Sequence, residues 1–188
     1  RKDTPANGGD FEIFLLFAGT EVRQFTINTT NDIDVSANSD ASGLTWQGKN
    51  PTTNVDAVFV IAGTGSFLEV PEPQTQPSMS ANGQFITMVR RLADGRERIM
   101  RFNRSAETYT TFYTSTADLE HPSITDDGTR VAFLQNGSIS DSISLKTLGV
   151  SSLTTLVSSI KFTSLEHPHL TRDGRWLTYT SETIDVSN

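Results

Sequence analysis

The chain has 188 residues, 35% of them hydrophobic and 20% charged, so it can bury a core as one domain or as two small ones. Its formal net charge is −7, which argues against nucleic acid as a partner because binding to phosphates needs a basic face. The absence of cysteine excludes disulfides and thiolate metal sites, and no apolar run is long enough to predict membrane insertion.

The N-terminal part of the chain predicts two strands. The stretch GGDFEIFLLFAGTEVRQFT, from Gly8 to Thr26, holds two apolar runs on either side of a glycine turn. Its aromatic and β-branched residues fit a pleated surface. We therefore expect a pair of antiparallel strands within residues 11–26.

A phrase of twelve residues then recurs four times. The copies begin at Val35, Pro77, Pro122 and Pro168, and they read VSANSDASGLTW, PSMSANGQFITM, PSITDDGTRVAF and PHLTRDGRWLTY. Successive starts are 42, 45 and 46 residues apart. A repeat of this length indicates a solenoid or a propeller, in which each copy belongs to one structural unit.

Each column of the repeat has a physical reason. The Asp/Asn-Gly pair in three copies is typical of a tight hairpin turn, because both residue types tolerate positive φ. The run after the turn alternates, as in residues 176–179, and predicts a strand buried on at least one face. The proline suits the start of a strand, where no ladder donor is needed. The first copy is degenerate, with Val35 in the proline column and Ala41 in the glycine column.

Two more strands recur after each of the first three copies. We expect them within residues 56–70, 96–114 and 142–158. The best helical candidate, residues 151–159, alternates at least as well as it follows a helical period. Each period therefore holds four short antiparallel strands, here called A to D, which is the pattern of β-propeller blades. The six arginines from Arg90 to Arg104 predict a solvated hairpin or, alternatively, a docking patch for an acidic partner.

The strand count predicts an all-β fold, a β-propeller of four-stranded antiparallel blades with four blade-equivalents in a single domain, residues 1–188. The blade segments are expected at 8–33, 34–75, 76–120, 121–166 and 167–188. The first segment supplies only C and D strands and the last only A and B strands, which leaves two edges unpaired. Those edges would pair in a closed four-bladed ring, or in an eight-bladed ring shared by two chains as a homodimer. A third interpretation is a slice of a longer propeller.

The repeat resembles that of a known family. Its pattern P-S-[IM]-[ST]-x-[DN]-G-x-x-[VI]-[AT]-[FM] is similar to the TolB-type, WD-like propeller repeat, and the N-terminal strand pair ending in QFT supports the likeness. The resemblance implies a propeller whose loop faces bind a protein or peptide partner, in a periplasmic or extracellular bacterial location. The same repeat resembles the propellers of prolyl-oligopeptidase-type and tricorn-type peptidases and of some polysaccharide lyases.

Histidines provide the candidate site. His121, His167 and His169 stand at the starts of A strands, which line the central channel of a propeller, and Glu120 and Glu166 precede two of them in the shared context LEHP. Imidazole and carboxylate groups from adjacent blades would meet at the channel mouth, where they could hold a metal ion. The alternative is that LEHP belongs to the repeat and that the histidine packs on or bonds to the neighbouring blade. We expect no cofactor apart from such a metal.

The sequence contains no catalytic motif that we could find. No G-x-S-x-G nucleophile elbow occurs. Ser78 and Ser123 follow the strand prolines and fit a Ser-His-Asp triad only loosely. We therefore expect a non-catalytic scaffold that presents its loop faces to a protein or peptide. The alternatives are the propeller portion of a larger peptidase or hydrolase, and a channel site for a small acidic or sugar ligand with a metal.

Overall fold

The computed structural model describes residues 9–17, 21–61, 66–67, 73–159 and 163–183. Every regular element in these ranges is a β-strand, as the composition predicts. The best helical candidate forms strand β14 (Leu153–Ser158). In the described part of the chain, no helix has the length and apolar character needed to cross a membrane.

Three four-stranded antiparallel sheets form most of the molecule, and in each the strands are adjacent in chain order. The first sheet contains β3 (Ile33–Ala37), β4 (Leu44–Lys49), β5 (Asp56–Ile61) and β6 (Ser66–Phe67). The second contains β7 (Gln74–Met79), β8 (Phe85–Arg91), β9 (Glu97–Asn103) and β10 (Thr108–Ser115). The third contains β11 (Asp118–Ile124), β12 (Arg130–Asn136), β13 (Asp141–Thr147) and β14. The expected segment boundaries at residues 34, 76 and 121 fall inside the A strands β3, β7 and β11.

Two two-stranded sheets complete the described structure. The N-terminal sheet pairs β1 (Phe14–Phe17) with β2 (Glu21–Gln24), and the C-terminal sheet pairs β15 (Thr163–Leu170) with β16 (Leu177–Thr183). Because β2 leads directly into the A strand β3, the N-terminal pair occupies the C and D positions of a blade. The C-terminal pair carries the fourth copy of the repeat and occupies the A and B positions, as the sequence predicts.

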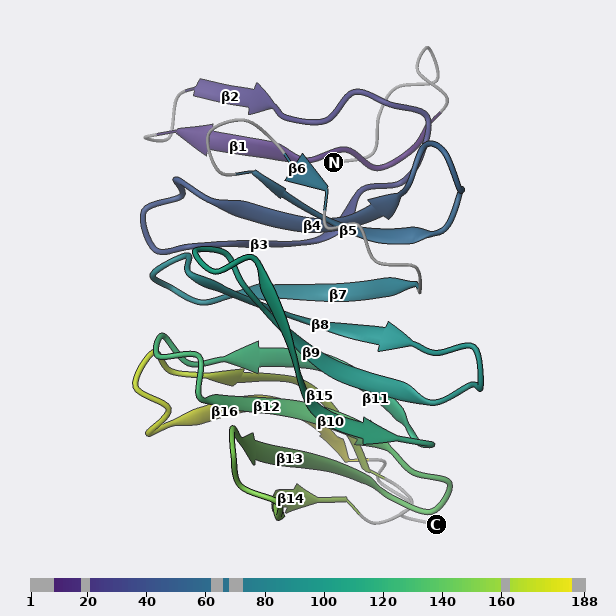
Figure 1. Cartoon of the computed structure of the whole chain (residues 1–188), viewed down its shortest axis with the longest axis vertical. Helices are drawn as coiled ribbons and strands as arrows, with labels where there is room; N and C mark the ends of the chain where they lie inside the picture. The colour runs from purple at the N-terminus through teal and green to yellow at the C-terminus, as the bar shows by residue number, and fades with distance from the viewer. Residues whose placement is uncertain (1–8, 18–20, 62–65, 68–72, 160–162, 184–188) are drawn as a thin grey trace.

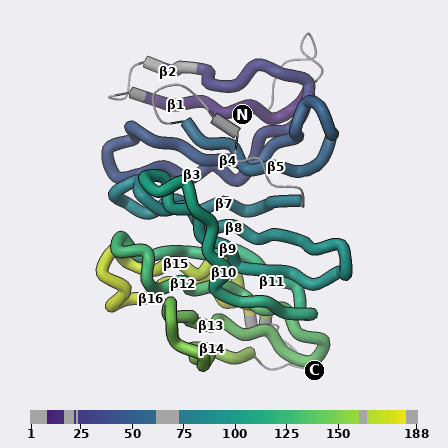
Figure 2. The backbone as a smooth tube through the Cα atoms, in the orientation of Figure 1, coloured from purple at the N-terminus to yellow at the C-terminus, as the bar shows by residue number. Residues whose placement is uncertain are grey.

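The blades form an open propeller, not a ring. Figure 1 shows the sheets following one another along the long axis, with the β1–β2 pair at one end and the β15–β16 pair beside β11 and β12 toward the other. The backbone tube in Figure 2 has the same order. The closed four-bladed ring is therefore not what this chain forms, because the two half-sheets lie apart and do not pair with each other.

Three apolar cores join neighbouring blades. The first contains Val58, Val60, Met79, Ile86, Met88 and Met100. The second contains Val89, Ile99, Phe112, Leu119, Ile124, Val131 and Phe133. The third contains Leu134, Ile143 and Leu165. The last column of the repeat supplies Met88 and Phe133 to these cores, and both are fully buried. The residue of the fourth copy in this column, Tyr179, lies on β16 and is 45% exposed.

The turn between the A and B strands has the backbone that the repeat predicts. Gly83, Gly128 and Gly174 have φ angles of 73°, 66° and 62°, and Ala41 in the degenerate copy keeps φ at 56°. A Cβ atom at Gly128 would lie 2.7 Å from ring atoms of Phe85. Glycine is therefore favoured there by close packing as well as by the left-handed backbone.

The arginines of the second blade divide between solvent and packing. Arg91 and Arg96 are exposed and pair with neighbouring carboxylates, as a solvated hairpin predicts. Arg101 instead lies between two aromatic rings, 5.1 Å from the centroid of Phe85 and 5.8 Å from that of Phe112. Such cation–π contacts are stronger when the guanidinium is desolvated, and burial lowers the pKa of Arg101 below its usual value. Arg101 is thus a packing residue that the sequence did not single out from the group.

Arginine side chains also connect one blade to the turn of the next. Arg101 donates through Nη1 to the carbonyl oxygen of Gly128 at 2.8 Å. Arg130, one blade further, donates through Nη1 to the carbonyl oxygen of Gly174 at 3.1 Å. These bonds pair turn carbonyls with charged donors and fix the position of each A–B turn against the preceding blade.

Candidate functional site

The four A strands β3, β7, β11 and β15 lie side by side in this order, and each has an irregularity at the same repeat position. The residue before the proline column has a left-handed backbone in all four, with φ of 53° at Asp34, 52° at Gln76, and 49° at His121 and His167. A positive φ is uncommon outside glycine, and β-bulges re-aim side chains. These four residues line one pocket of about 240 Å³.

The structure brings most of the predicted site residues together here. The rings of His121 and His167 contact each other, with centroids 4.5 Å apart and planes inclined by 35°. Glu120 Oε2 lies 4.0 Å from His121 Nε2, and Glu166 Oε2 lies 3.6 Å from His167 Nδ1. The fifth candidate, His169, lies two residues further along β15 and lines both this pocket and a larger one.

Side chains in this region also bond to the backbone of the adjacent blade. The backbone N–H of His121 donates to Gln76 Oε1 at 2.6 Å, and the backbone N–H of Gln76 donates to Gln47 Oε1 at 3.0 Å. In both cases the side-chain oxygen of a glutamine accepts a backbone N–H that the bulge removes from the strand ladder. The packing of His121 on His167 agrees with the interpretation that LEHP is part of the blade-to-blade contact.

The environment of His121 disfavours its charged form. Burial, followed by the nearby His167, lowers the pKa of His121 below 6.5, and Glu120, Asp34 and Glu166 oppose this shift. The folded-state pKa of the imidazole is therefore lower than its unfolded-state pKa. As the pH falls through about 6.5 the unfolded chain binds this proton first, so His121 makes the fold less stable on the acid side.

Removing the second ring is expected to raise the pKa of His121. His167→Ala exposes the imidazole of His121 and removes the neighbouring titratable group, while the three opposing carboxylates remain. An NMR titration of the His121 ring protons measures the change. His169→Ala is the control, because His169 does not contribute to the shift, and equal titration curves for His121 in the wild type and in His167→Ala would contradict this explanation.

The predicted metal site brings two histidines together, but its set of ligands is incomplete. Within the described ranges, no three His, Asp or Glu side chains meet in an arrangement that could hold a metal ion. The two rings instead contact each other. A metal at this mouth stays a prediction, and it would require both rings to turn away from their mutual contact.

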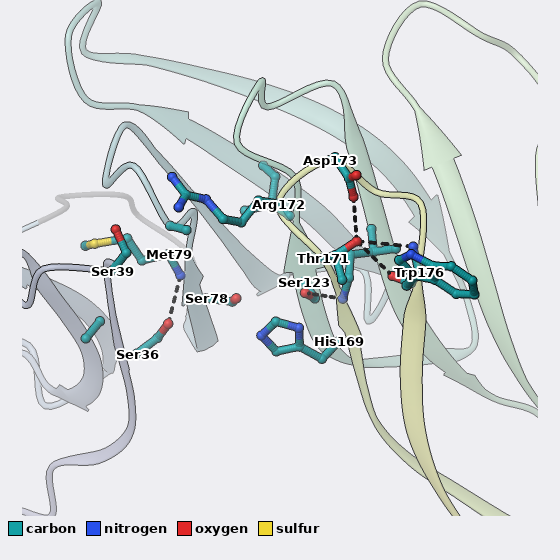
Figure 3. A pocket seen from close by; sticks show the side chains of 14 residues that line it. Ser36, Ser39, Ser78, Met79, Ser123, His169, Thr171, Arg172, Asp173 and Trp176 are labelled. Carbon is teal, nitrogen blue, oxygen red and sulfur yellow. Dashed lines mark hydrogen bonds between the residues drawn. The ribbon is translucent and has the colours of Figure 1, made fainter.

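A larger pocket lies along the same four A strands, toward their A–B turns. Its volume is about 710 Å³. Figure 3 shows side chains from every A strand around it. Its lining includes Ser36, Ser78, Ser123, His169, Arg172 and Asp173. Figure 3 shows His169 below Ser78 and Ser123 in this view, with Ser36 to its left.

The serines of this pocket hold adjacent A strands together. The hydroxyl of Ser36 accepts a hydrogen bond from the backbone N–H of Met79 at 3.0 Å, and that of Ser123 accepts one from Leu170 at 3.0 Å. In the described part of the chain neither hydroxyl is hydrogen-bonded to a histidine. The hydroxyls of Ser36 and Ser123 therefore have a structural function between adjacent A strands. This geometry gives no support to a Ser-His pair.

Two features of this pocket were missed by sequence reasoning. The column Ser36, Ser78, Ser123 and His169 is visible in the repeat alignment as the position after the proline, but its contacts across strands are not. Arg172 carried no signal, because the equivalent positions in the other copies are Ser39, Ala81 and Asp126. A search of each repeat column for a single basic residue would have found it.

Comparisons with known proteins identify the fold. No protein-family model and no curated protein matches the chain. Among solved structures, TolB from Acinetobacter baumannii matches with a TM-score of 0.68 and 17% identity over 90% of this chain and 42% of that one. A putative TolB from Agrobacterium tumefaciens matches with a TM-score of 0.65 and 17% identity over 81% of this chain and 58% of that one.

A peptidase has the same fold in part of its chain. A puromycin-hydrolyzing peptidase from Mycobacterium tuberculosis matches with a TM-score of 0.62 and 12% identity, over 93% of this chain and 35% of that one. At these identities the likeness concerns the fold alone. The chain spans about half the length of the two TolB structures, so their functions as whole proteins do not transfer with the fold.

Proposed function

From the premise that this chain has a TolB-like β-propeller fold, we propose that it is a non-catalytic scaffold that binds a protein or peptide segment along its A strands. The resemblance to TolB-type propellers supports a protein-binding function. The fold supports it physically, because blades stay fixed while loops and channel side chains vary. By the same resemblance we propose a periplasmic location.

One observation carries the proposal: the larger pocket takes side chains from all four A strands. Its volume of about 710 Å³ is within the range of sites that hold a small molecule or several peptide residues. The pocket combines serine hydroxyls and charged groups with the apolar side chains of Met79, Ile124 and Leu170. Such a mixture of an apolar surface and a few placed polar groups is typical of binding sites.

Selection of peptides tests this proposal. The chain is immobilised and panned with a phage-displayed library of random 12-residue peptides. We expect enriched peptides whose binding is lost in Ser78→Trp, which fills the pocket from strand β7. The matched control is Thr154→Trp on the exposed outer strand β14, which should keep binding. No enrichment, or enriched peptides that bind Ser78→Trp as well as the wild type, would contradict a binding site in this pocket.

A second candidate function is the propeller portion of a larger peptidase. The match to the mycobacterial peptidase favours it, because that match covers 93% of this chain but only 35% of the peptidase. The parent gene decides between the two functions. An adjoining α/β-hydrolase domain with a G-x-S-x-G elbow would favour the peptidase, and its absence on both sides would favour the scaffold.

We also propose the homodimer as one route to pair the open edges. β16 of one chain would pair with β1 of the next, as B and C strands pair within each complete blade. Light scattering across a dilution series is expected to give twice the chain mass of 20.6 kDa. A mass equal to that of one chain at every concentration would exclude this route.

A further inference from the structure

The larger pocket contains hydroxyl groups whose protons are available. A serine hydroxyl has one donor proton and two acceptor lone pairs. Ser36 and Ser123 each use a lone pair to accept a backbone N–H from the adjacent A strand, at 3.0 Å in both cases. Their O–H protons are therefore left to point elsewhere, and both residues line the pocket. Figure 3 shows Ser78 between them on the middle strand.

Two stronger donors come from β15 and the turn that follows it. Arg172 is paired with Asp126 through its Nε atom, at 2.7 Å from Asp126 Oδ2. The two Nη groups of a guanidinium remain able to donate when Nε is paired. Figure 3 shows the guanidinium of Arg172 extending across the pocket toward Ser39 and Met79. The imidazole of His169 projects between the serines, and it donates through one ring nitrogen when neutral and through two when charged.

Three acceptors around the pocket already have partners. The carbonyl oxygen of Ala81 accepts the N–H of Ser39 at 2.8 Å, and that of Arg172 accepts the N–H of Asp126 at 2.9 Å. The carboxylate of Asp173 serves its own turn, because Oδ1 accepts Thr171 Oγ1–H at 2.7 Å and the N–H of Arg175 at 3.1 Å. Among the described residues that line this pocket, Arg172 is the only arginine or lysine, and its Nη groups are the charged donors left for a ligand.

We propose that the larger pocket recognises a carboxylate of the bound segment, with Arg172 as its main partner and His169 and the serine hydroxyls as further donors. This inference rests on the proposed function and names the chemistry that the site selects. Charge-assisted bonds to a carboxylate are the strongest that such donors make, and a guanidinium fits a carboxylate geometrically. The carboxylate comes either from an Asp or Glu side chain or from a peptide C-terminus.

The peptides recovered by panning distinguish these two sources. Each peptide is synthesised with a free or an amidated C-terminus, and with its Asp and Glu residues intact or replaced by Asn and Gln. Fluorescence anisotropy gives the Kd of each form. We expect at least a tenfold weaker Kd when one of the two carboxylate sources is removed. Equal Kd values for all forms would overturn carboxylate recognition, while pocket-dependent binding would leave the proposed function intact.

Variants of the turn assign the carboxylate to its partner. Arg172→Gln should remove most of the tenfold preference. Arg175→Gln is the matched control, because it deletes the same charge three residues away, outside the pocket, from a side chain that is 80% exposed. His169→Gln keeps a donor and His169→Phe does not, so only the second should weaken binding of the carboxylate form. A preference unchanged in Arg172→Gln, or lost equally in Arg175→Gln, would overturn the assignment.

Discussion

Phe133→Ala is expected to lower the free energy of unfolding by about 3–5 kcal/mol, the range for truncating a fully buried aromatic residue. Phe133 has no exposed surface and lies in the core between the second and third blades. Its ring stacks on that of Tyr113 from the preceding blade, with centroids 5.4 Å apart. The substitution removes apolar area and leaves a cavity between two rigid sheets, which cannot close without moving a blade. Urea unfolding followed by circular dichroism measures the loss.

The repeat supplies a matched control for this substitution. Tyr179 occupies the same column in the fourth copy but is 45% exposed. Tyr179→Ala should cost about 1 kcal/mol or less, as surface substitutions do. Similar losses of stability for the two variants would contradict the placement of Phe133 in the core between two blades.

Gly128→Ala is expected to cost about 2–5 kcal/mol, as the sum of a left-handed backbone and an overpacked contact. The φ angle of Gly128 is 66°, and an added Cβ would lie 2.7 Å from two ring atoms of Phe85. That ring contacts the guanidinium of Arg101, which in turn holds the carbonyl of Gly128. The methyl group therefore disturbs the turn and the contact between two blades at once.

Gly95 separates the two contributions. It also has a left-handed backbone, with φ of 83°, but nothing lies within 4 Å of an added Cβ. Gly95→Ala should therefore cost only the backbone term, about 1–2 kcal/mol. Thermal and urea unfolding measure the loss of stability in both variants. If Gly128→Ala were no more destabilising than Gly95→Ala, the contact with Phe85 would not contribute to the cost.

The strands and turns could be predicted from the sequence because their signals are local. The Asp-Gly turn at Gly128 and the alternation on either side of Phe133 each involve neighbouring residues. The bulge at His121 was not predicted, although the proline after it marks a strand start. A left-handed residue before a proline is unusual, and at His121 its backbone N–H donates a hydrogen bond to Gln76 of the adjacent blade.

The arrangement of the blades and the pocket depends on contacts that the repeat does not encode. Whether four blades close into a ring depends on how each sheet packs on the next, as where Phe133 stacks on Tyr113. The meeting of His121 and His167 followed from their shared column, because equivalent residues of neighbouring A strands lie side by side. The projection of Arg172 into the pocket did not follow, since its column has no common side chain.

The measurement that tests the account most directly is an NMR search for a nuclear Overhauser effect between the ring protons of His121 and His167. The chain contains only three histidines, so single substitutions assign their signals. The account predicts a strong effect, because ring centroids 4.5 Å apart require the A strands of adjacent blades to lie side by side. Two assigned and sharp ring signals with no effect between them would contradict the arrangement of A strands on which the pocket and its proposed function depend.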